Sequence, residues 1–102
     1  MNAERRKRIE EVKATLARLK SDIDVAAIGL GDLKDEIESI RDEEQDAYDA
    51  MPEGLQGAEN GQKLEASVGS LETAMDGVDT LITDLDGLDF PEVENALDEA
   101  AE

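Results

Sequence analysis

Apolar residues recur at alternating steps of three and four along the first half of the chain, which is the spacing of a coiled-coil seam. The same frame continues without insertion through Glu44, Ala47 and Met51, so it predicts one long helix over residues 3–51. The seam consists of Ile9, Val12, Leu16, Leu19, Ile23, Ala26, Leu30, Leu33, Ile37 and Ile40.

Two glycines inside this predicted helix support an alternative fold. Gly29 and Gly31 each cost about 1 kcal/mol in a helix interior, and together they could form a turn that divides the helix and gives a three-helix bundle. A turn normally shifts the heptad count, whereas Ala26, Leu30 and Leu33 keep it. We therefore favour the continuous helix, with the three-helix bundle as the alternative.

The chain after the long helix predicts a loop and two further helices. Pro52 and the three glycines that follow it predict a loop over residues 52–61. A second seam predicts a helix over residues 62–87, and a proline favours a short helix over residues 91–100. The second seam consists of Leu64, Val68, Leu71, Met75, Val78, Ile82 and Leu85.

These elements predict an all-α, single-domain helical hairpin with a long first helix. Since the second helix is about half as long as the first, we expect it to leave the N-terminal part of the seam bare. Burying such side chains gains about 1.5–3 kcal/mol each, so we expect a homo-oligomer, a dimer or larger, of undetermined helix orientation. The expected self-association residues are Ile9, Val12, Leu16, Leu19, Ile23, Leu30 and Leu33.

The residue types that are missing from the chain exclude most catalytic chemistry. Among 102 residues there is neither Cys nor His, so a disulfide, a zinc site, a His base and a Cys nucleophile are all ruled out. The acidic run 84–89 resembles a calcium loop, but its glycine comes fourth where an EF-hand needs it sixth. We therefore expect no enzyme, no cofactor and no specific metal site.

Charge divides the chain into a basic head and an acidic body. Residues 1–20 carry seven bases and three acids, whereas residues 22–102 carry 25 carboxylates. The head offers candidate anion contacts, but without aromatic residues for base stacking we do not expect nucleic-acid binding. It could instead pair with the acidic part of another copy or simply be solvated. The candidate anion contacts are Arg5, Arg6, Lys7 and Arg8.

The acidic body could imitate a nucleic acid. If it is about 45 Å long, its 25 carboxylates approach the charge density of duplex DNA, which carries one charge per about 1.7 Å. Solubility is the simpler explanation of such a charge. The chain has no apolar run of membrane-spanning length and no signal peptide, so we expect a cytoplasmic protein without membrane contact.

The end of the long helix holds a second group of candidate contact residues. Glu44 falls on the seam, where an ionised carboxylate is costly unless it is paired. A small shift of the frame would instead turn Tyr48 inward. We expect hairpin geometry or partner contact to depend on Glu44, Gln45, Tyr48, Pro52 and Leu55.

The stretch DEEQDAYDAMPEGLQ, residues 42–56, resembles a motif in small uncharacterised acidic helical proteins of bacteriophages and prophages. In those proteins a long charged helix leads into the motif and an acidic amphipathic helix follows it. The resemblance covers roughly residues 33–85 and implies a phage origin, but it brings no agreed biochemical function. The basic head and the tail after Pro91 lie outside it.

Three functions are compatible with these features. The first is a non-catalytic accessory protein that binds a host or phage protein, with inhibition of a host defence or DNA-handling protein as its form. The second is a self-assembling phage structural or scaffold component. The third is an oligomer that sequesters a small ligand such as a nucleotide, for which cationic pockets are needed.

Overall fold

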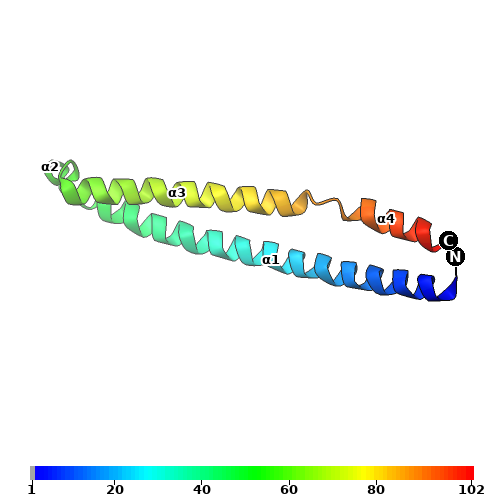
Figure 1. The fold of residues 1–102 in the computed structure, drawn as a ribbon. Coiled ribbons are helices and arrows are strands. Elements are labelled where there is room, and N and C mark those ends of the chain that lie inside the picture. Colours follow the sequence, from blue (N-terminus) through cyan, green and yellow to red (C-terminus); the bar gives the residue numbers. More distant parts are fainter. Residues whose placement is uncertain (1) are drawn as a thin grey trace.

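The chain folds as one long helical hairpin, described over residues 2–102 in a computed structural model. Four helices follow one another: α1 (Ala3–Asp49), α2 (Glu53–Gln56), α3 (Glu59–Asp86) and α4 (Phe90–Ala101). α1 forms one arm, and α3 with α4 forms the returning arm, so that both termini lie at the same end (Figure 1). The all-α hairpin fold that the apolar spacing predicts is therefore confirmed.

Helix α1 runs unbroken through both of its glycines. The side chain of Asn2 caps its first turn by accepting a hydrogen bond from the Arg5 amide at 2.8 Å. A Cβ built on Gly29 or Gly31 would meet no neighbouring atom within 4 Å, so neither glycine is there to relieve a close contact. The alternative with a turn at these glycines, the three-helix bundle, is wrong, because the helix seam keeps its phase across them.

The second half of the hairpin differs from the prediction in its extent. α1 ends at Asp49, two residues before the expected end, and the expected loop contains the short helix α2. α4 continues the direction of α3 and contacts the N-terminal half of α1 (Figure 1). The expectation that this half of the first seam stays bare is wrong for Ile9, Leu16 and Ile23, which are half-buried because the returning arm continues past the short break after Gly87. Val12 and Leu19 of the same half stay exposed, as expected.

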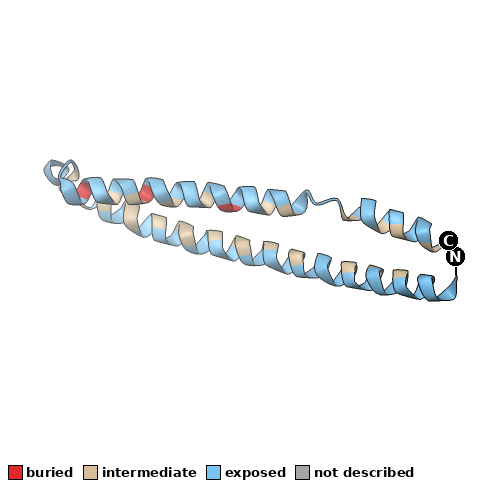
Figure 2. Cartoon of the chain, in the orientation of Figure 1, coloured by how far each residue is buried: buried red, intermediate tan, exposed pale blue. Residues whose placement is uncertain are grey.

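The hairpin has very little interior. Among residues 2–102 the buried apolar residues are Val68 and Val78, each 7% exposed, and the other buried position is Gly61, all three in α3 (Figure 2). Its accessible surface is 7279 Å² and its radius of gyration 23.3 Å. A compact monomer of 11.0 kDa has about 5,600 Å² and about 13 Å. The single chain therefore leaves much more surface exposed than a globular protein of its mass.

Candidate interaction surfaces

In the structure, half of the predicted seam residues of α1 face the returning arm and the other half face solvent. Ile9, Leu16, Ile23 and Leu30 are half-buried on the inner face of the hairpin, and all are spaced by seven residues. The alternate seam positions are exposed instead: Val12 is 51%, Leu19 is 48% and Leu33 is 49% exposed. Three residues of the expected self-association set thus stay available to another chain, and four are used within the hairpin.

Cations take the inner positions that these apolar residues leave. Each lies four residues after an inner apolar residue and reaches a carboxylate of the returning arm. The long aliphatic stems of Lys and Arg cover the apolar line while the charged ends stay near solvent. We call this set the ion-pair ladder, and its rungs are Lys13–Asp98 at 2.7 Å, Lys20–Glu94 at 3.5 Å, Lys34–Asp79 at 2.8 Å and Arg41–Glu72 at 3.7 Å.

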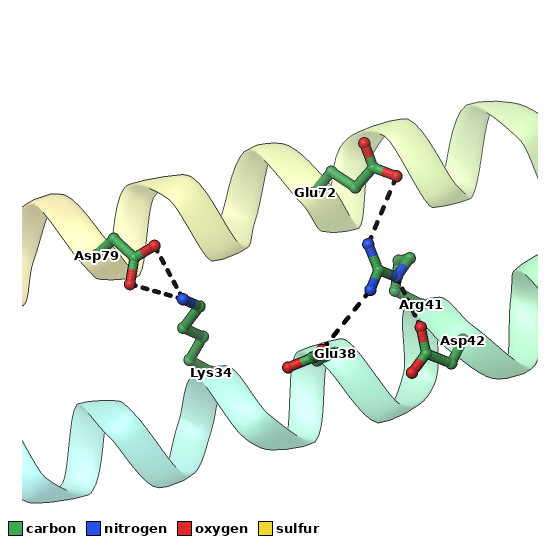
Figure 3. Close-up of polar contacts among 6 residues, drawn as sticks. All are labelled: Lys34, Glu38, Arg41, Asp42, Glu72 and Asp79. Carbon is green, nitrogen blue, oxygen red and sulfur yellow. Dashed lines mark hydrogen bonds and ion pairs between the residues drawn. The ribbon is translucent and has the colours of Figure 1, made fainter.

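Two rungs of the ladder join α1 to the middle of α3 (Figure 3). The Lys34 ammonium donates to both carboxylate oxygens of Asp79, at 2.8 and 2.9 Å. Arg41 also donates to Asp42 at 2.9 Å and lies 3.8 Å from Glu38. Figure 3 shows Arg41 between carboxylates of both helices, so this guanidinium fixes how α1 and α3 are aligned.

Neighbouring carboxylates raise the pKa of Lys13, Lys34 and Arg41. The hydrogen bond that Lys13 donates to Asp98 raises the pKa of Lys13, and the hydrogen bond that Lys34 donates to Asp79 raises that of Lys34, in each case against a smaller opposing effect of burial. The hydrogen bond to Asp42 likewise raises the pKa of Arg41. These cations therefore keep their charge to a somewhat higher pH than they would in an unfolded chain.

An exposed apolar stripe runs along the side of the hairpin opposite the ladder. In α1 it occupies the position three residues after each inner apolar residue, whereas the ladder occupies the position four after. Leu16 shows the division, because it borders one shallow depression with Lys13 and Glu94 and another with Val12 and Leu19. We define the apolar stripe as Val12, Leu19, Leu33 and Ile40 of α1 with Leu81, Leu88 and Val93 of the returning arm, which are 40–51% exposed.

Both arms place their part of the stripe on the same side. In α3 the stripe position directly precedes an inner residue, as Leu81 precedes Ile82. Because the arms are antiparallel, this position points to the same side as the stripe positions of α1. A third depression supports this at the open end of the hairpin, since Leu16 borders it together with Leu88 and Val93. The hairpin therefore has one charged side and one apolar side.

The basic head lies at the open end of the hairpin. Arg5, Arg6, Lys7 and Arg8 are exposed, and within residues 2–102 none of them forms an ion pair. Arg5 and Arg8 border a shallow surface depression with Ile9 and Val12. This depression is open and is not an enclosed ligand site. It connects the basic head with the apolar stripe, which begins at Val12.

The closed end of the hairpin is shaped by two residues that the sequence did not single out. Gln56 donates from its side-chain amide to the carbonyls of Tyr48 and Met51, at 3.2 and 3.4 Å, and so ties the tip of the hairpin to the end of α1. A Cβ on Gly61 would overlap the backbone carbonyl of Gln56. The loop glycines have no positive φ, so Gly61 is needed for space and not for a left-handed conformation.

The predicted contact residues of this end are separated by the structure. Glu44 and Tyr48 are both half-buried on the inner face, and Gln45 donates to Asp49 at 2.9 Å. Pro52 and Leu55 are exposed at the tip, where Leu55 is 52% exposed. The first three are thus part of the hairpin, and Leu55 alone offers a large apolar side chain to a partner.

The acidic body is longer and less densely charged than expected. The hairpin extends 79 Å, so the 25 carboxylates of residues 22–102 give one per about 3.2 Å, against one charge per about 1.7 Å in duplex DNA. The net charge of −18 of the whole chain gives one net negative charge per about 4.4 Å. The expected length of about 45 Å is wrong, because α1 stays continuous and α4 extends the returning arm.

Two further properties concern the part of the chain that the structure describes. Over residues 2–102 there is no cluster of three or more acidic side chains arranged to hold a metal ion. In the same residues no helix combines the length and the apolar character that crossing a membrane requires.

Comparisons with protein-family models, with curated proteins and with solved structures found no match.

Proposed function

We propose that this chain is a non-catalytic accessory protein of phage type that acts by binding a basic surface of another protein. The observation that carries the proposal is the orientation of its charges. From residue 21 onward every base is engaged by a carboxylate: Lys34 and Arg41 within the ladder, and Lys63 with Glu59 at 3.2 Å. Outside the apolar stripe, the surface of the body therefore carries a large excess of carboxylates over bases.

A surface of this kind favours a partner that binds nucleic acid. An acidic rod steers toward a basic groove over long distances, and its affinity falls as salt screens the charges. A host defence or DNA-handling protein has such a groove. The expected effect is inhibition by occupation of that groove, and it needs no catalytic group on this chain.

The test is an affinity capture from bacterial lysate at low and high salt, followed by identification of the bound proteins. We expect a nucleic-acid-binding protein that is held at low salt, released at high salt and displaced by duplex DNA. A shuffled polypeptide of identical composition serves as the control for unspecific charge effects. Capture that is unaffected by salt, or equal to the control, would contradict the proposal.

A matched variant makes this test specific for the outer surface. Asp32, Asp46 and Asp76 are exposed and take no part in the ladder through their side chains. The triple variant Asp32→Asn, Asp46→Asn and Asp76→Asn should keep the hairpin and lose the salt-sensitive partner. Equal capture by the variant would assign binding to another surface.

A self-assembling structural or scaffold component is the second candidate. The apolar stripe favours it, because a long exposed apolar side is typical of chains that assemble. Large assemblies that grow with protein concentration, and presence of the protein in purified virions, would support this function over the first.

A further inference from the structure

The apolar stripe has a symmetric residue pattern. On α1 it reads Val12, Leu19, Ala26, Leu33, Ile40, so that residues of similar size lie at equal distances from Ala26. On the returning arm Leu81 and Val93 lie equally far on either side of residue 87, next to Leu88. The ladder places these two centres opposite each other: 34 faces 79 and 41 faces 72, so the same register brings 26 opposite 87.

A pattern with this symmetry is complementary to itself when one copy is reversed. A two-fold axis through Ala26, perpendicular to the helices, sets Val12 of one copy against Ile40 of the other and Leu19 against Leu33. The interface is then isologous, with the same patch used twice, and it closes at two copies. The small Ala26 at the axis permits close approach of the two α1 helices.

The charges at the ends of the stripe favour the same orientation. In the reversed arrangement the head of one copy lies over the closed end of the other, and the register that pairs 12 with 40 brings Arg8 opposite Glu44. Residues 42–63 carry seven carboxylates and one Lys, whereas the exposed Arg5 and Arg8 have no ion-pair partner within residues 2–102. A parallel arrangement would instead place like charges together.

The size of the hairpin is compatible with a stable dimer. One whole side of the hairpin, which includes the apolar stripe, measures at most 79 by 16 Å, or roughly 1,200 Å², and a standard interface uses about 800 Å² per partner. The excess surface of the single chain, 7279 Å² against about 5,600 Å² for a compact monomer, is of the corresponding size.

We infer that the apolar stripe binds a second copy of this chain in antiparallel orientation, forming a four-helix bundle with the ladders on its outside. The inference concerns self-association of the purified protein, so it stands or falls independently of the proposed partner.

The first experiment measures the mass of the purified full chain by light scattering. We expect about 22 kDa, twice the 11.0 kDa of one chain. The double variant Leu19→Glu and Leu33→Glu should be a helical monomer, because both side chains are exposed in the single hairpin. The control variant Val25→Glu and Ile28→Glu should remain a dimer, since these residues are 65% and 68% exposed but lie off the stripe.

The second experiment tests the orientation with single cysteines, which the natural chain lacks. Mixed and oxidised, the variants Val12→Cys and Ile40→Cys should form the mixed disulfide in preference to either symmetric one. A monomeric natural chain, an unchanged dimer in the Leu19 and Leu33 variant, or preferential disulfides between two copies of the Val12 variant would each overturn the inference.

Discussion

The two long sides of the hairpin differ in what completes them. On the ladder side, cations of α1 meet carboxylates of the returning arm, as at Lys34 and Asp79, and nothing further is required. On the stripe side, large apolar residues such as Leu19 and Leu81 remain about half exposed. Exposed ion pairs add little to the free energy of unfolding. The ladder therefore aligns the arms, while the larger stabilisation depends on covering the stripe.

This difference also bears on the acidic surface. Joining two copies through their stripes would double the charge over the same length, to one net negative charge per about 2.2 Å. That density is close to the density of duplex DNA, which a single hairpin does not reach. Pairing of the apolar sides and binding by the charged sides would then support each other.

The largest loss of stability is expected from a charge placed among the buried apolar residues between the two arms. Val78→Asp places a carboxylate at one of the best-buried positions, and should lower the free energy of unfolding by about 3 kcal/mol or more. Urea unfolding followed by circular dichroism measures this. Val25→Asp, at an outward position of α1, is the control and should change stability by less than about 0.5 kcal/mol; equal losses would mean that Val78 is not buried.

The next largest loss of stability is expected at the closed end. The tight return there fixes the register of the two arms, and so decides which residues face each side. Gly61→Ala forces a Cβ against the Gln56 carbonyl and should cost about 1–3 kcal/mol. Gly77→Ala is the matched control, because its Cβ meets no neighbouring atom and the change should stabilise α3 by about 0.5–1 kcal/mol. Thermal unfolding distinguishes the two, and stabilisation by both would show that the tight return is absent.

A smaller effect should follow from completing the ladder. Between the rungs at Lys20 and Lys34 the series lacks a cation, because position 27 is Ala and the register sets it opposite Asp86. Ala27→Lys should therefore stabilise the hairpin by about 0.3–1 kcal/mol at low salt, and the gain should vanish at high salt. The control Ala14→Lys adds the same charge at an exposed position. An equal gain in stability from both variants would show that the gain comes from the less negative net charge and not from a new rung.

The smallest effect is the pH dependence of the ladder side. The pKa of Lys34 is raised in the folded chain by its hydrogen bond to Asp79. Its contribution to stability is therefore complete below the unfolded pKa of about 10.4 and is lost as the pH rises through the folded pKa. The urea midpoint is measured at one pH below the unfolded pKa and at one pH above the folded pKa. Between these two values it should fall less for Lys34→Arg than for the natural chain, since Arg stays charged. Identical falls would argue against the rung.

The sequence predicts the hairpin because its two seams are long and regular. It assigned Leu16 and Ile23 to self-association, however, whereas the structure places both on the inner face of the hairpin. It assigned Val12 and Leu19 to the same interface because their hydrophobicity fits the heptad. Their places are taken by Lys13 and Lys20, whose role depends on Asp98 and Glu94, far away in the chain. Such pairing cannot be read from one helix.

The course of the returning arm was also beyond the sequence. Gly87 and Pro91 mark a break in the helix, but its direction depends on how α4 packs on α1. Likewise Gly61 shows only a missing side chain, and the reason for it is the position of the Gln56 carbonyl. Local patterns predict elements here, whereas contacts between the arms decide which side each residue faces.

The central claim is that one side of the hairpin is covered in solution while the other stays open. It is tested most directly by the alkylation rates of two single-cysteine variants, Leu33→Cys on the stripe and Ile28→Cys off it, over a range of protein concentrations. We predict that the rate at position 33 falls steeply as the concentration rises and that the rate at position 28 stays constant. Equal rates at both positions at every concentration would contradict the account.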